Sequence, residues 1–234
     1  MGGWVLEAGA LVLANKGLIA IDEFEKMSKE DQIAMHEALE QGSISIAKAS
    51  IVATLPAKTS VLAGGNPSLS RFDPYKPIAK QINIPETLLS RFDLKFVLRD
   101  VPNVEKDKKI VDHILRIRSS GNESNEILEP EFIRKYIAYA KEHCNPELSE
   151  EAKKILKKFY LNTRKVVEGL GSDVVPITLR QFEALIRLAE ASARVQLSSV
   201  VRKEDAKRAI RLMKYSLEQL GYSCLLYTSP SPRD

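Results

Sequence analysis

The chain has 234 residues, and its 44% hydrophobic content is enough for one large folded domain or two modest ones, which excludes an intrinsically disordered protein. The 35 basic and 31 acidic side chains leave a net charge of only +4, so net charge by itself does not indicate a nucleic-acid-binding protein. Two isolated cysteines and three scattered histidines provide neither a disulfide framework nor a zinc site, and no apolar run approaches the roughly 20 residues of a membrane span, so we expect a soluble intracellular protein.

The first hundred residues alternate short apolar runs with turn residues, which is typical of an α/β domain. The run at 18–21 is continuously apolar and predicts a strand that is buried on both faces of a parallel sheet. Similar runs predict strands at 59–63 and at 94–98.

A helix and a hairpin are predicted between the first two of these strands. Ser28 is a good helix-capping residue and Gly42 a good terminator, so we expect a helix from about residue 29 to residue 41. Apolar residues then alternate on both sides of a short segment of small residues, which predicts a β-hairpin over 43–55 with Lys48 near its tip.

Every apolar pattern in residues 104–220 has helical spacing, so this part is predicted to be all-helical. One of its helices should begin at a capping box formed by Thr178 and Gln181. Residues 119–129 are polar enough for a linker. The chain begins inside an element, which we interpret as the sign of a fragment, and residues 221–234 are interpreted as a disordered or foreign tail.

Two acidic residues carry the clearest chemical signal. Asp22 and Glu23 follow the strand at 18–21 directly, and open α/β sheets bind ligands at the carboxyl ends of their strands. This is a Walker-B arrangement, in which Asp22 would help to hold Mg²⁺ through its water shell and Glu23 would deprotonate the water that attacks a γ-phosphate. The alternative is a strand that ends in two solvated acids.

Two further candidate residues, Asn66 and Arg91, lie next to predicted strands. Asn66 follows the strand at 59–63 and a Gly-Gly pair, so its amide could hold the attacking water or a phosphate oxygen, whereas an ordinary Asn-Pro turn is the favoured explanation of this residue taken alone. Arg91 precedes the strand at 94–98, and arginine suits bidentate phosphate contact, although a lone arginine there is usually structural.

The segments IDEF, SIAKA, GGNP and LSRFD, at residues 21–24, 45–49, 64–67 and 89–93, together closely resemble the AAA+ motor of the minichromosome maintenance (MCM) replicative helicases, the archaeal forms in particular. The resemblance covers residues 1–220. It implies an α/β fold with a partial AAA+ P-loop NTPase core, built on a parallel sheet with a β-hairpin insert, over 1–103. An all-helical region that includes the AAA+ lid would occupy 104–220.

The resemblance also implies roles for single residues. Asp22 and Glu23 match the Walker B acids, and Asn66 matches sensor 1. Arg91 matches the arginine finger that reaches the ATP of the neighbouring subunit, and Arg180 matches sensor 2. Lys48 matches the basic residue of the hairpin that faces DNA inside the ring; without the resemblance, we would interpret it as a solvated lysine.

The resemblance therefore implies an ATP-dependent DNA helicase of DNA replication, with ATP and Mg²⁺ as cofactors and with DNA and other MCM subunits of a hexameric ring as partners. An archaeal cytoplasm is favoured as its location, or a nucleus in a eukaryote. No glycine precedes a lysine, so Walker A is absent; we expect it upstream of Met1 in the family, and the chain alone to be inactive. Another AAA+ remodelling ATPase, such as a metal-chelatase subunit, and a non-catalytic assembly fragment remain alternatives.

Overall fold

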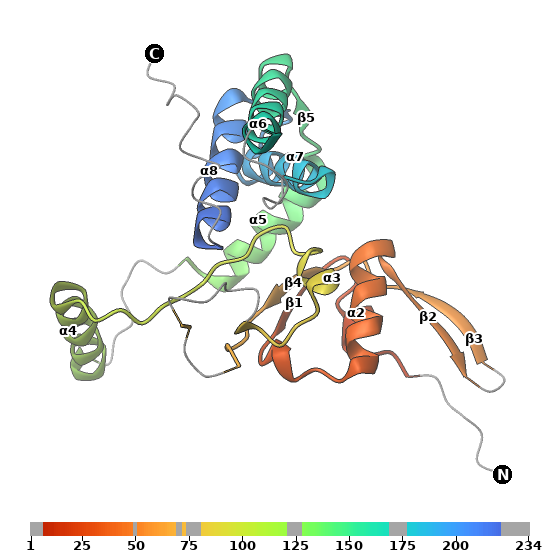
Figure 1. Ribbon diagram of the computed structural model, residues 1–234, viewed down its shortest axis with the longest axis horizontal. Helices are drawn as coiled ribbons and strands as arrows, with labels where there is room; N and C mark the ends of the chain where they lie inside the picture. The colour runs from red at the N-terminus through yellow and green to blue at the C-terminus, as the bar shows by residue number, and fades with distance from the viewer. Residues whose placement is uncertain are drawn as a thin grey trace, which may run out of the picture. The chain divides into compact units, whose positions relative to one another are not determined.

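The computed structural model describes residues 7–48, 51–68, 72–73, 81–120, 128–168 and 177–220 (Figure 1). The chain divides between Lys95 and Phe96 into two compact units, of which the first is mixed α/β and the second is mostly helical. The predicted fold class, a partial α/β core followed by a helical region, is confirmed. The described part of the chain contains no helix that is long and apolar enough to cross a membrane.

The sheet of the first unit is built from two parallel strands, β1 (Leu18–Ile21) and β4 (Ser60–Ala63), in a register that pairs Ile21 with Ala63. Both strands were predicted. The prediction that β1 is buried on both faces is wrong, because alternate residues of each strand are exposed, Leu18 at 67% and Leu62 at 64%. One face of this two-stranded sheet carries no covering layer in the described residues.

Helix α2 (Lys29–Gln41) has the predicted ends. The Ser28 hydroxyl accepts a hydrogen bond from the Asp31 backbone N–H at 3.1 Å, and Gly42 ends the helix with φ +67°, a conformation that favours glycine. The short elements α1 (Ala10–Leu13), η1 (Phe24–Lys26) and α3 (Glu86–Leu89) complete this part, and its core is formed by three buried side chains, Phe24, Met35 and Leu88.

The predicted hairpin is also present, as the antiparallel strands β2 (Ser43–Lys48) and β3 (Ile51–Pro56). It is joined to α2 near its base, because the Glu37 carboxylate accepts a hydrogen bond from the Ser45 backbone N–H at 2.8 Å. Lys48 is the last residue of β2 and pairs with Ile51.

The prediction of a strand at 94–98 is wrong, because these residues do not pair with another strand in the described part of the chain. A strand needs a neighbouring strand whose backbone groups pair with its own donors and acceptors. At 94–98 a side chain and an aromatic contact take the place of such a neighbour. The Val97 backbone N–H donates instead to the Gln219 side chain at 2.7 Å, and the Phe96 ring packs on Tyr215.

The second unit contains five helices among the described residues: α4 (Val104–Ser120), α5 (Pro130–His143), α6 (Glu150–Glu168), α7 (Leu179–Val195) and α8 (Lys203–Gln219). The prediction that this part contains helices alone is corrected by two short parallel strands, β5 (Glu147–Leu148) and β6 (Val200–Val201). Each has only two residues, too few to show a strand period. The first two residues of the linker predicted at 119–129 belong instead to α4, and residues 121–127 and the tail 221–234 lie outside the described residues.

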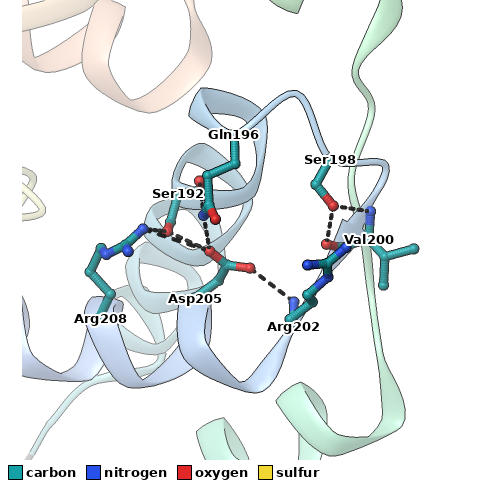
Figure 2. A network of polar contacts seen from close by, with 7 residues as sticks. All are labelled: Ser192, Gln196, Ser198, Val200, Arg202, Asp205 and Arg208. Carbon is teal, nitrogen blue, oxygen red and sulfur yellow. Dashed lines mark hydrogen bonds and ion pairs between the residues drawn. The ribbon is translucent and has the colours of Figure 1, made fainter.

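Helices α6, α7 and α8 pack on one another around small and apolar side chains that include Leu156, Leu185 and Met213. A polar network also joins α7 to the start of α8 (Figure 2). Asp205, which is 3% exposed, accepts hydrogen bonds from the Ser192 hydroxyl at 2.6 Å, the Gln196 amide at 2.8 Å and the Arg202 backbone N–H at 3.0 Å. Asp205 therefore caps α8 from within the helix, which compensates for the arginine at the N-cap position.

Candidate functional site

The end of β1 and the end of β4 meet at one edge of the sheet. Beyond the paired strands, the Gly64 backbone N–H donates to the Ile21 carbonyl at 2.8 Å, and the Phe24 N–H donates to the Gly64 carbonyl at 2.9 Å. The β-carbon that an alanine would add at Gly64 would lie 3.5 Å from Asp22 Oδ1. The segment that leads to Asn66 therefore lies directly against the turn that carries the two acids, as expected for parallel neighbours.

Glu23 has a backbone conformation that is uncommon for a residue with a side chain, with φ 50° and ψ 42°. The next residue, Phe24, is 2% exposed and packs edge-on against Phe92 with ring centroids 5.5 Å apart. This buried anchor holds the turn, so that Asp22 and Glu23 both remain exposed at the edge of the sheet. Strained backbone of this kind gathers at functional sites.

The exposed carboxylate of Glu23 is paired with the ammonium of Lys26. A side-chain hydrogen bond from Lys26 to Glu23, followed by the charge of the same carboxylate, raises the pKa of Lys26, and Glu25 and Asp22 add to the effect. Asp22 Oδ1 accepts the Glu23 backbone N–H at 2.8 Å. A solvent-exposed pair such as Glu23–Lys26 is weak, so Glu23 can exchange it for water or another ligand.

Glu25 is a residue of this edge that no sequence pattern indicated. A β-carbon on Gly65 would lie 2.7 Å from Glu25 Oε2, and this oxygen is buried without a hydrogen-bond partner in the part of the chain that the structure describes. The second glycine of the Gly-Gly pair thus permits close packing between the two loops. The sequence signal that could have identified Glu25 is the Gly64–Gly65 pair after β4 together with an acid shortly after β1.

Arg91 follows helix α3 and contacts α2 of the same unit. Its Nη2 lies 2.7 Å from Glu40 Oε2, its side chain is only 10% exposed, and its Nε is buried without a partner among the described residues. No sequence pattern had indicated Glu40. The Asp22–Glu23 turn lies against Gly64, two residues before Asn66, whereas the guanidinium of Arg91 is engaged with α2.

The last two predicted residues lie elsewhere. Lys48 ends β2, and its side chain lies outside what is described. Arg180 belongs to the second unit, where it is the second residue of α7 and is half-buried. The capping box predicted from Thr178 and Gln181 is confirmed, with the Gln181 N–H 3.2 Å from Thr178 Oγ1 and the Thr178 N–H 2.8 Å from Gln181 Oε1.

The donor set at the sheet edge fits a hard cation that is held partly by other ligands. Asp22 and Glu23 offer exposed carboxylate oxygens, the ligand type that Mg²⁺ prefers. No group of three or more potential metal ligands occurs among the residues that the structure describes. Mg²⁺ is usually bound by one or two carboxylates together with waters and substrate phosphates, so this edge suits such an ion.

Comparisons with known proteins agree over both units. The sequence profile of the MCM P-loop domain matches residues 1–118, and that of the MCM AAA-lid domain matches residues 131–217. The chain is 46% identical over 220 residues to the minichromosome maintenance protein MCM of Saccharolobus solfataricus, which covers 94% of this chain and 32% of that protein.

Two eukaryotic relatives extend the comparison. The chain is 42% identical over 222 residues to the DNA replication licensing factor MCM4 of Arabidopsis thaliana, with 93% of this chain and 26% of the relative covered. It is 39% identical over 252 residues to the DNA helicase MCM8 of Gallus gallus, with 92% and 30% covered. The chain thus spans about a third or less of the length of these relatives. Since the two profiles together match most of both units, the chain belongs to the minichromosome maintenance family.

Proposed function

We propose that this chain is part of an ATP-driven motor that unwinds DNA during replication, with a nucleotide site at the carboxyl edge of the β1–β4 sheet. The observation that carries the proposal is the parallel pairing of β1 with β4, which sets the Asp22–Glu23 turn against the loop that leads to Asn66. The names of the relatives, which include a DNA helicase, support the same activity.

In this proposal the three residues at the sheet edge divide the work of hydrolysis. Glu23 accepts the proton of the attacking water, because its carboxylate is exposed and its contact with Lys26 is weak. Asp22 holds Mg²⁺ through water, and Asn66 orients the water or a γ-phosphate oxygen through an amide that does not titrate. The bound ion would supply charge neutralisation for the ATP phosphates.

The remaining roles require a ring of subunits, which we propose to be a hexamer. Arg91 and Arg180 complete the ATP site of a neighbouring subunit, where guanidinium groups stabilise the charge that develops on the phosphates. Lys48, at the end of β2, contacts the phosphate backbone of DNA. Such a protein would act in the cytoplasm of an archaeon or in a eukaryotic nucleus.

The chain contains no Gly-Lys-Ser/Thr sequence and therefore no loop of the kind that cradles phosphates. We propose that the residues above act only together with such a loop from the rest of the protein, and that the chain alone does not turn over ATP. The comparisons favour this helicase over a metal-chelatase subunit, since the matched profiles and the relatives named above are all of the MCM family.

The test is an exchange protein in which residues 1–220 replace the matching segment of the Saccharolobus relative. We expect ATPase activity that single-stranded DNA stimulates, together with strand separation. Glu30→Gln, an exposed acid in the first turn of α2, is the matched control for changes at Glu23. ATP hydrolysis that single-stranded DNA does not stimulate would instead indicate another kind of remodelling ATPase. Assembly of the exchange protein into rings without ATP hydrolysis would indicate a non-catalytic piece.

A further inference from the structure

We propose that Arg164 of α6 is a positioning residue for Arg180, so that the lid aims Arg180 through a contact between two helices. The inference rests on the proposed role of Arg180 at a neighbouring ATP site. It concerns a different residue, which belongs to no sequence motif and which lies 16 positions earlier in the chain.

Arg164 holds the backbone just before α7. Its Nη1 donates to the Ile177 carbonyl at 3.2 Å and lies 3.3 Å from the Tyr160 hydroxyl, and its Cζ lies 5.7 Å from the centroid of the Tyr160 ring. Ile177 is itself 3% exposed. The guanidinium therefore joins one turn of α6 to the segment from which α7 begins.

A second contact reaches α7 just after Arg180. The ring of Tyr160, on which Arg164 lies, packs on the ring of Phe182 with centroids 5.0 Å apart. Between these two points the Thr178–Gln181 capping box fixes the first turn of α7. Contacts with α6 thus fix Ile177 before Arg180 and Phe182 after it, so the backbone of Arg180 has little freedom to rotate.

The far end of α7 is held independently. The Ser192 hydroxyl and the Gln196 amide donate to Asp205 of α8, as Figure 2 shows, and the Val195 carbonyl accepts a hydrogen bond from the Tyr136 hydroxyl at 2.7 Å. Helix α7 is therefore fixed at both ends, and at the end that carries Arg180 the hydrogen bond to the backbone just before the helix comes from Arg164 of the neighbouring helix α6.

The two arginines differ in what they do for the fold. The side chain of Arg180 makes no hydrogen bond or ion pair with the residues that the structure describes, whereas that of Arg164 contacts both Ile177 and Tyr160. A planar guanidinium can lie on a ring and donate at its edge simultaneously, which an ammonium does less well. The arrangement suits a supporting arginine behind one that is available to meet a phosphate.

A double-mutant cycle in the exchange protein tests the inference. We expect Arg164→Ala to lower kcat by roughly 10- to 100-fold, since small misplacements of a catalytic group have effects of this size. The double variant Arg164→Ala/Arg180→Ala should have the same kcat as Arg180→Ala alone, because no arginine remains at position 180 for Arg164 to position. Arg164→Lys should recover part of the loss. Lys165→Ala, an exposed neighbour of equal charge, should leave kcat unchanged.

Hydrogen exchange on the 234-residue chain separates this inference from the proposed function. The Gln181 and Phe182 amides donate to the Thr178 side chain and carbonyl, so Arg164→Ala should speed their exchange while Lys165→Ala does not. Unchanged exchange, or independent losses of kcat in the double variant, would overturn the positioning role. Faster exchange with normal kcat for Arg180→Ala would instead overturn the proposed role of Arg180.

Discussion

The guanidinium of Arg91 is paired with the carboxylate of Glu40 in the same chain, at 2.7 Å between Nη2 and Oε2. The arginine side chain is 10% exposed and the glutamate 47%, so the pair lies at the margin of the fold, with the acid facing water. An arginine that acts on a neighbouring subunit would have to exchange this carboxylate for a phosphate oxygen. Carboxylate and phosphate both offer oxygen acceptors that arginine binds well, so replacing one with the other conserves the hydrogen bonding of the guanidinium.

The first prediction concerns the direction in which Arg91 acts. Arg91→Ala subunits and Glu23→Gln subunits of the exchange protein are each expected to be nearly inactive. In a mixture, some sites combine an intact Glu23 with an intact Arg91 from the neighbour, so the mixture should hydrolyse more ATP than either variant alone. A mixture with no gain would show that Arg91 acts within its own subunit or only through Glu40.

The second prediction concerns Glu23 alone. Glu23→Gln keeps the size of the side chain and removes its ability to accept a proton, so kcat of the exchange protein should fall by roughly 10²- to 10⁴-fold. Nucleotide affinity should change little, because Gln retains a polar oxygen. Measured kcat within a few-fold of the parent would exclude Glu23 as the base, and Glu30→Gln controls for the removal of one acid.

Local sequence signals predicted the elements whose ends depend on neighbouring residues. Ser28 and Gly42 fixed both ends of α2, and the capping box of Thr178 fixed the start of α7. The apolar runs before Asp22 and before Gly64 were enough to predict strands, and parallel pairing then brings their ends together.

Contacts between residues far apart in the sequence could not be predicted in the same way. Glu40 lies 51 positions before Arg91, and no spacing rule links an acid on a helix with a basic residue after a turn. The strand expected at 94–98 failed for a related reason, because strand propensity needs a neighbouring strand and the Val97 N–H bonds to a glutamine side chain instead.

The third prediction concerns Asp205 and the stability of the second unit. Burial raises the pKa of Asp205, but hydrogen bonds from Ser192, Arg202 and Gln196 and the charge of Arg208 outweigh it and lower the pKa below its ordinary value of 3.8. The ionised form therefore stabilises the folded state above about pH 4, and this stabilisation disappears as the pH falls through the lowered pKa.

Asp205→Asn should accordingly lower the free energy of unfolding at pH 7 by about 1–3 kcal/mol, as expected when a buried charged acceptor is removed. The difference from the parent should begin to shrink below about pH 4 and disappear as the pH falls through the lowered pKa of Asp205, where the carboxylate of the folded parent becomes protonated. Urea unfolding of the 234-residue chain at neutral and at acidic pH, followed by helical circular dichroism, measures both. Glu204→Gln, its exposed neighbour, should have little effect at either pH; an equal destabilisation at both pH values would contradict the role of ionisation.

The last prediction concerns Lys48, the residue that ends β2 and pairs with Ile51 across the hairpin. The hairpin is anchored to α2 near its base by Glu37 and extends away from that anchor, so its far end can meet a ligand without disturbing the sheet edge. A lysine at that end can neutralise one phosphate per subunit, and a phosphate contact carries no base information.

Lys48→Ala in the exchange protein should therefore weaken binding to DNA about equally for all sequences and reduce the dependence of log Kd on log salt by about one for each phosphate that is no longer neutralised. Strand separation should fail, whereas ATPase activity without DNA should persist, because Lys48 belongs to the hairpin and not to the edge that carries Asp22 and Glu23. Lys29→Ala, an exposed lysine at the first position of α2, controls for the removal of one positive charge. Normal strand separation by Lys48→Ala would assign Lys48 to the solvated surface, and an equal defect in Lys29→Ala would reduce the effect to net charge.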